Sequence, residues 1–144
     1  ILSRPSFLSL CLILTTTLAA STKLERTEQH LRDAIEEARN RGAQLDAMGN
    51  QLMLAAVLAD QARYDESQAI LVAILPDLPR AMSIQALDEL ARGHMAMGRL
   101  EDADAALTQA GERMEGLPED VAVHLRASLW GTLGVLRMHQ ARLD

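Results

Sequence analysis

Apolar residues recur every three or four positions along most of the chain, which predicts amphipathic helices. Over residues 24–38, Leu24, Leu31 and Ile35 share one face, and charged residues occupy the other. No stretch alternates apolar and polar residues in the way that a half-buried strand does. The pattern therefore predicts an all-α fold.

The same periodicity predicts five more helices, and prolines separate them in pairs. A proline cannot continue a helix, so Pro76, Pro79 and Pro118 mark places where helices end. The predicted helices cover residues 46–60 and 65–76, then 82–97 and 101–114, and finally about 120–140.

The corners beside these helices resemble one another in "STKLERT", "QARYDES", "MGRLEDA" and "QARLD". Aligning Thr22, Ala62, Gly98 and Ala141 gives steps of 40, 36 and 43 residues. In each corner a small residue allows a sharp exit, and an acid follows where the next helix dipole favours it. This recurrence predicts a repeated helix hairpin.

These features resemble the tetratricopeptide repeat family, whose pattern includes W-x2-L-G and a later proline. Trp130, Leu133 and Gly134 match the first part, and Pro79 stands at a position expected for the second. The long spacing resembles bacterial regulator versions of the repeat. The resemblance implies a right-handed α-solenoid of antiparallel helix pairs, truncated at the C-terminus. Its units would cover about 8–42, 46–79 and 82–118, with a partial unit over 120–144.

The segment "FLSLCLILTTTLAAS" at 7–21 has two interpretations. It is either the first helix of a first repeat or, within residues 1–20, the apolar region of a signal peptide. The first interpretation predicts a cytoplasmic protein and the second an exported one. A chain that opens on Ile1 is interpreted as a fragment of something longer.

Composition argues against several function classes. The net charge is −6 and the arginines are scattered, which disfavours a nucleic-acid surface. Cys11 is the single cysteine, and the four histidines are far apart in the sequence. Glu101, Asp102 and Asp104 do not follow the pattern of a calcium loop, and we interpret them as helix-start residues. We therefore expect no catalysis, no metal, no cofactor and no membrane span.

The resemblance also implies a concave face that receives partners. The family register places methionines on this face, either as core filling or as a pliant apolar surface. The acids beside them suit a basic or an apolar segment. The residues expected to form this groove are Met53, Asp60, Asp88, Glu89, Arg92, Met95, Met138 and His139.

The sequence thus predicts a non-catalytic scaffold that binds a peptide or partner helix. The alternative is a sensory or regulatory segment of a larger bacterial signalling protein, such as a transcriptional regulator or a eukaryotic-like kinase. The incomplete last unit predicts either fraying or a homodimer formed through the open C-terminal repeat.

Overall fold

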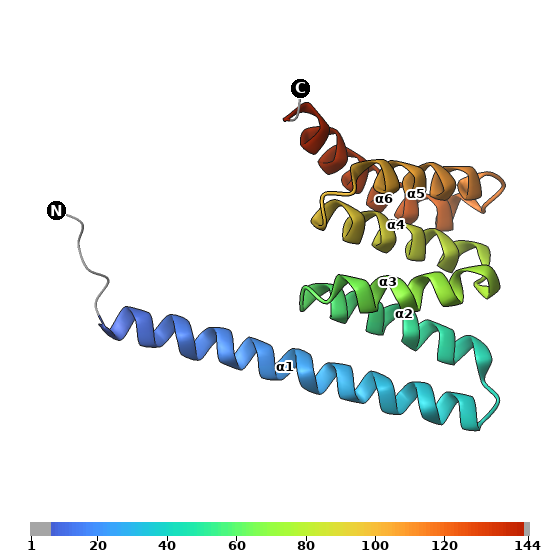
Figure 1. Cartoon of the computed structure of the whole chain (residues 1–144). Helices are drawn as coiled ribbons and strands as arrows, with labels where there is room; N and C mark the ends of the chain where they lie inside the picture. The colour runs from blue at the N-terminus through green and yellow to red at the C-terminus, as the bar shows by residue number, and fades with distance from the viewer. Residues whose placement is uncertain (1–6, 143–144) are drawn as a thin grey trace.

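The structure is a computed structural model that describes the backbone of residues 7–142 and the side chains of residues 15–142. Within these residues every regular element is a helix, and the all-α prediction is confirmed. Successive helices run in opposite directions and stack in chain order (Figure 1). The elements are α1 (Phe7–Asn40), α2 (Gln44–Asp60), α3 (Tyr64–Ile74), η1 (Leu75–Asp77), α4 (Arg80–Ala96), α5 (Leu100–Met114) and α6 (Glu119–Ala141).

Three corners share one local geometry. Gly42, Ala62 and Gly98 all have positive φ, at 71°, 58° and 74°. In each corner the next N–H donates to the carbonyl oxygen five residues before it, at 2.8–2.9 Å. This bond satisfies a carbonyl that the ending helix leaves free, as in a Schellman motif. The predicted corners at 62 and 98 are therefore equivalent in structure.

The predicted corner at Thr22 is wrong, because α1 runs through it without a break. No proline or glycine interrupts residues 7–40, and threonine only weakens a helix. Thr22 Oγ1 donates to the Ala19 carbonyl at 2.9 Å, and Thr27 Oγ1 to that of Lys23 at 3.0 Å. The predicted first unit, 8–42, is therefore one long helix that ends at Asn40, followed by a turn, rather than a helix pair. The predicted corner at 140–144 lies partly outside the described residues.

Helices that alternate along the chain also pack against each other. α4 contacts α2 on one side and α6 on the other, while α5 packs against both α4 and α6. α3 packs against α2 and α4. The face shared by α2, α4 and α6 is therefore assembled from three separate segments of sequence.

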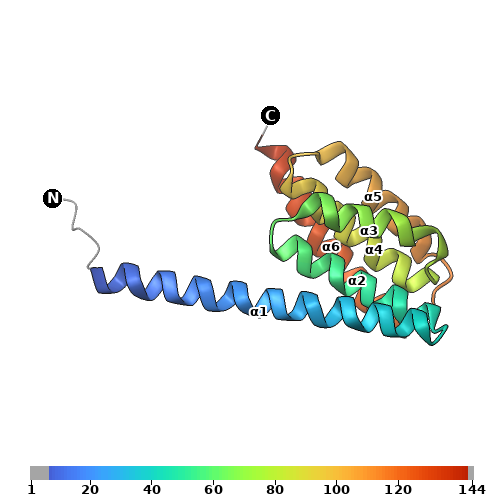
Figure 2. The ribbon, with the colours of Figure 1, turned by 60° about the horizontal axis from the view of Figure 1, so that its bottom comes forward.

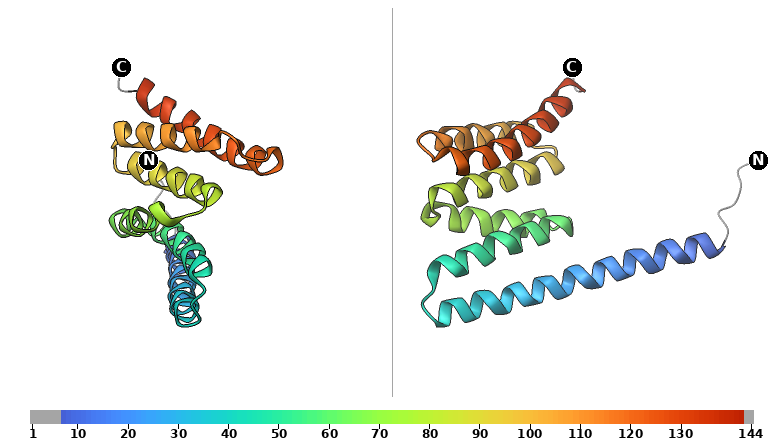
Figure 3. Two further views of the ribbon diagram at one scale, coloured as in Figure 1. Left: turned by 90° about the vertical axis from the view of Figure 1, so that its right-hand side faces the viewer. Right: turned by 180° about the vertical axis from the view of Figure 1, so that it is seen from behind.

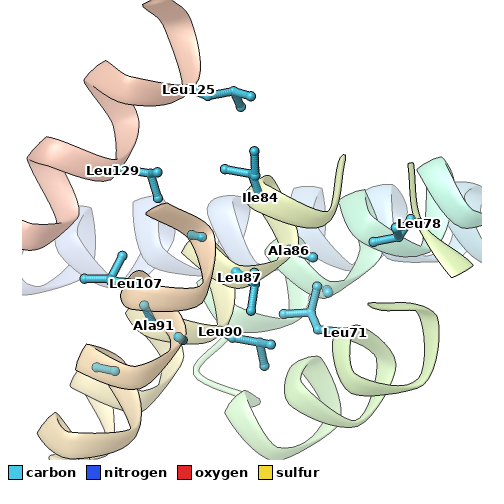
Figure 4. Packing of buried hydrophobic residues seen from close by; sticks show 14 of the residues in the cluster. Leu71, Leu78, Ile84, Ala86, Leu87, Leu90, Ala91, Leu107, Leu125 and Leu129 are labelled. Atoms are coloured by element: carbon cyan, nitrogen blue, oxygen red, sulfur yellow. The ribbon is translucent and has the colours of Figure 1, made fainter. Parts of the chain in front are cut away.

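The main core lies between α2, α3, α4, α5 and α6, and Figure 4 shows part of it. Leu71 lies beside Leu87 and Leu90, while Ile84 faces the side of α6 that carries Leu125 and Leu129. Leucine and alanine fill this core because aromatic residues make up only 2% of the sequence. The second core cluster joins α1 to α2 through Leu31, Ile35, Leu54 and Leu58.

Only the C-terminal half of α1 belongs to this packing. Its buried residues are Leu31, Ile35 and Ala38, and its described side chains from 15 to 22 are all exposed. Glu28 marks the transition, since it accepts from Arg63 Nη1 at 2.7 Å and from Gln61 Nε2 at 3.2 Å. Figures 2 and 3 show the N-terminal half projecting beyond the other helices.

Candidate binding groove

A hollow of about 360 Å³ lies on the face where α2, α4 and α6 meet, and we call it the groove. Its walls combine apolar side chains with a group of charged and polar ones. The lining residues are Leu52, Met53, Ala56, Ile84, Gln85, Asp88, Glu89, Arg92, His124, Leu125, Ser128 and Leu129.

Asp88 is the most deeply buried charged residue of the groove, with 4% of its surface exposed. Its Oδ2 accepts from Ser128 Oγ at 2.6 Å and from Arg92 Nη2. Arg92 Nη2 also donates to Ser128 Oγ, at 3.1 Å. This triangle joins α4 to α6 on the groove side, since Ser128 belongs to α6.

The second carboxylate oxygen of Asp88, Oδ1, has a different environment from Oδ2. Oδ1 is buried, and no group among the residues that the structure describes donates a hydrogen bond to it. An unsatisfied buried oxygen is costly, and more so on a charged group. The groove therefore contains a carboxylate with capacity for one more donor.

Glu89 adds a second acid next to Asp88. Burial raises the pKa of its carboxyl above the ordinary value, and the charges of Asp88 and Asp60 act in the same direction. Arg92 opposes this shift through an ion pair, with 3.4 Å between Nη1 and Glu89 Oε1. Because one arginine faces two acids here, the groove has a surplus of negative charge.

The groove continues into a second hollow of about 610 Å³ that also uses Arg92 and Ser128. Met95 and His139 contribute to this hollow, and so do Thr132 and Val135 of α6. The two hollows together follow the junction of α4 and α6. This length suits an extended or helical segment better than a compact small molecule.

The predicted groove residues divide into three groups in the structure. Met53, Asp88, Glu89 and Arg92 lie together in the groove, and Met53 is 59% exposed. Met95 and His139 line the adjoining hollow, although Met95 is mostly buried in the core. Asp60 and Met138 are exposed but line neither hollow.

Sequence reasoning missed the α6 wall of the groove. His124 and Ser128 lie there, one helical turn apart, with Leu125 and Leu129 beside them. The available signal was the spacing of Leu125, Leu129, Thr132 and Leu136, which fixes the buried face of α6. His124 is both exposed and part of the groove lining.

His94 lies away from the groove, at the junction of α3, α4 and α5. Gln68 Nε2 is 3.1 Å from its Nδ1, and Asp102 Oδ2 is 3.9 Å from the same nitrogen. Burial lowers the pKa of the imidazole, while the Asp102 carboxylate partly counteracts this effect. His94 is therefore a neutral packing residue that accepts from Gln68 at neutral pH.

Comparison with protein-family models, curated proteins and solved structures finds no match to this chain. Among the residues that the structure describes, no three His, Cys, Asp or Glu side chains gather as metal ligands. In the same part of the chain, no helix has the length and apolar character needed to cross a membrane.

Proposed function

We propose that this chain is a non-catalytic protein-interaction module that binds a peptide or partner helix in the groove. In this proposal the helix pairs form a tetratricopeptide-like solenoid, with α2, α4 and α6 as its concave layer. The packing of α4 between α2 and α6 supports this arrangement, because alternate helices line the inner face of such repeats.

The observation that carries the proposal is the chemistry of the groove. Apolar side chains from all three helices line the hollow together with the exposed Met53, and an adaptable methionine suits an apolar anchor. The buried Asp88 carboxylate lies in the same hollow, and its Oδ1 accepts no hydrogen bond from the described part of the chain. The occupant is therefore an apolar segment with one lysine or arginine that pairs with Asp88 and Glu89.

Selection from a displayed library of random peptides tests this function. We expect the enriched peptides to carry a basic residue between apolar ones. They should bind the isolated protein with weak to moderate affinity. Met53→Glu introduces a charge among the apolar contacts and should weaken binding by roughly tenfold or more.

Val72→Glu is the matched control, because Val72 is 61% exposed on α3 and lines neither hollow of the groove. It should bind the selected peptides as tightly as the unaltered protein. An equal loss of peptide affinity in Met53→Glu and Val72→Glu, or failure to enrich any peptide, would reject the groove as a binding site.

A further inference from the structure

A second hollow of about 430 Å³ lies between α5 and α6, away from the groove, and we call it the α5–α6 cleft. It exposes a large apolar surface, because Trp130 is 68% exposed at its edge. Its lining residues are Asp104, Leu107, Thr108, Gly111, Met114, Arg126, Leu129, Trp130, Leu133 and Arg137.

The repeat within the chain indicates what kind of element fits there. Trp130, Leu133 and Gly134 of α6 correspond in pattern to Leu87, Leu90 and Ala91 of α4. On α4 these positions are buried in the core that α4 shares with α5. On α6, Trp130 and Gly134 are exposed and Leu133 is half-buried. The α5–α6 cleft is therefore shaped to receive another helix.

The ion pairs beside the α5–α6 cleft indicate that the docking helix carries no charged residue at the contact. Arg137 pairs with Asp104 at 3.5 Å, and Arg126 pairs with Glu119 at 3.2 Å. Each charged side chain that lines the cleft therefore already has an opposite charge within the same chain. An occupant with its own charges would gain no free partner there and would lose hydration.

The chain itself contains such a helix. Residues 7–22 are helical and carry no charged residue, and we call this segment the α1 arm. Its described side chains are exposed, including Leu18 at 67%. A helix of this length spans about 24 Å, while the cleft runs along α6 for about 17 Å between Arg126 and Arg137.

We propose that the α1 arm of one copy docks in the α5–α6 cleft of a second copy. In the structure the arm points away from its own body, so the contact joins two molecules (Figure 1). Burying Leu18 and Trp130 together removes two exposed apolar side chains from water, which favours association. Because two different surfaces meet, two copies can exchange arms and form a closed dimer. Otherwise the copies assemble into an open filament.

Concentration-dependent association is the first test, by sedimentation velocity and by fluorescence of Trp130, the single tryptophan. We expect association in the micromolar range, with Trp130 emission shifting to shorter wavelength as the complex forms. Leu18→Glu and Trp130→Glu should each weaken association by roughly tenfold or more. Val72→Glu, on the exposed face of α3, should not change it. A monomer at every concentration from micromolar to millimolar would overturn the proposal.

Cross-linking identifies the surfaces. Gly134→Cys is a mild change, because no atom lies within 4 Å of the added Cβ. With a short bis-maleimide, Cys11 of one copy should link to the new cysteine of another. The link should disappear when Cys11→Ser is added. If dimers persist in that double variant, α6 contacts α6 and the proposal is wrong.

A lipid surface is the competing occupant of the arm. Vesicles of phosphatidylcholine and phosphatidylglycerol provide the probe. If the protein is monomeric in solution and Leu18→Glu releases it from these vesicles, the arm binds lipid, which also overturns the proposal. Neither self-association nor vesicle binding depends on peptide binding in the groove. The docking of the α1 arm and the proposed function can therefore be rejected separately.

Discussion

Ser128 on α6 donates a hydrogen bond to Asp88 on α4, with 2.6 Å between Oγ and Oδ2. The two residues are 40 positions apart in the sequence, and the bond joins alternate helices across the groove. It also supplies one of the two donors that the structure gives to the buried Asp88 carboxylate. The contact that organises the groove therefore also attaches α6 to the rest of the fold.

Ser128→Ala should lower the free energy of unfolding by about 1–2 kcal/mol, because it leaves a buried carboxylate with one donor fewer. Urea denaturation at neutral pH measures this difference. Ser21→Ala is the control, since Ser21 is exposed on the α1 arm and its contact with Glu25 is long, at 3.5 Å. If Ser21→Ala lowered the free energy of unfolding as much as Ser128→Ala, the hydrogen bond between Ser128 and Asp88 would have no special role in stability.

The corner at Gly98 supplies a second prediction. Gly98 has φ of 74°, and a Cβ there would meet no atom within 4 Å, so Gly98→Ala introduces backbone strain alone. We expect a loss of about 1 kcal/mol. Gly111→Ala should instead stabilise by up to about 1 kcal/mol, because Gly111 lies inside α5 with open space around it.

Ala62 occupies the equivalent corner with φ of 58°, which an alanine adopts only under strain. Ala62→Gly should therefore raise the free energy of unfolding, in the direction opposite to Gly98→Ala. Chemical denaturation of the two variants measures both signs. The equivalence of the two corners would be contradicted if both substitutions destabilised the protein.

Glu89 and Glu28 should respond to pH in opposite ways. The folded pKa of Glu89 is raised, so its contribution to stability is present at low pH and is lost as pH rises through that pKa. Glu89→Gln should therefore be more stable than the unaltered protein at neutral pH, and the difference should vanish in acid. Such a result is expected of a residue that serves binding at the expense of stability.

Glu28 provides the matched comparison. Hydrogen bonds from Arg32 hold the pKa of its carboxyl below the ordinary value, with Gln61 and Arg63 acting in the same direction. The contribution of Glu28 to stability is present at neutral pH. It is lost as the pH falls through the lowered pKa. Glu28→Gln should cost about 1 kcal/mol at neutral pH. Shifts of the same sign in both Gln variants would contradict this account.

His94 should make stability depend on pH in a higher range. Its folded pKa lies below 6.5, so the unfolded chain takes up the proton first as pH falls. The free energy of unfolding should therefore decrease as pH drops below 6.5 and level off below the folded pKa. Replacing His94 with Gln should remove this slope, and urea denaturation over a series of pH values measures it.

The sequence was most informative where local chemistry sets the ends of helices. The predicted segment 82–97 corresponds to Arg80–Ala96, and 101–114 to Leu100–Met114. Apolar periodicity and a glycine in the corner act within a few residues, so both are readable from the chain alone. The same reasoning failed at Thr22, which was aligned with Ala62 and Gly98 as the small residue of a corner, although its hydroxyl donates a hydrogen bond within α1.

The groove was predictable in part, for a different reason. Asp88, Glu89 and Arg92 share one face of α4, which helical spacing alone indicates. Ser128 lies 40 residues after Asp88 and meets it only because α6 packs on α4. The unsatisfied oxygen of Asp88 likewise depends on the surrounding packing, which periodicity does not specify.

A double-mutant cycle on a selected peptide tests the central claim most directly. Its two changes are Asp88→Asn in the protein and replacement of the basic peptide residue by norleucine, which keeps the alkyl chain without the charge. We predict that each change weakens binding and that the two losses together are clearly less than additive, because both remove the same pairing. Fully additive losses, or equal affinity of the norleucine peptide for the unaltered protein, would contradict recognition of a basic residue by Asp88.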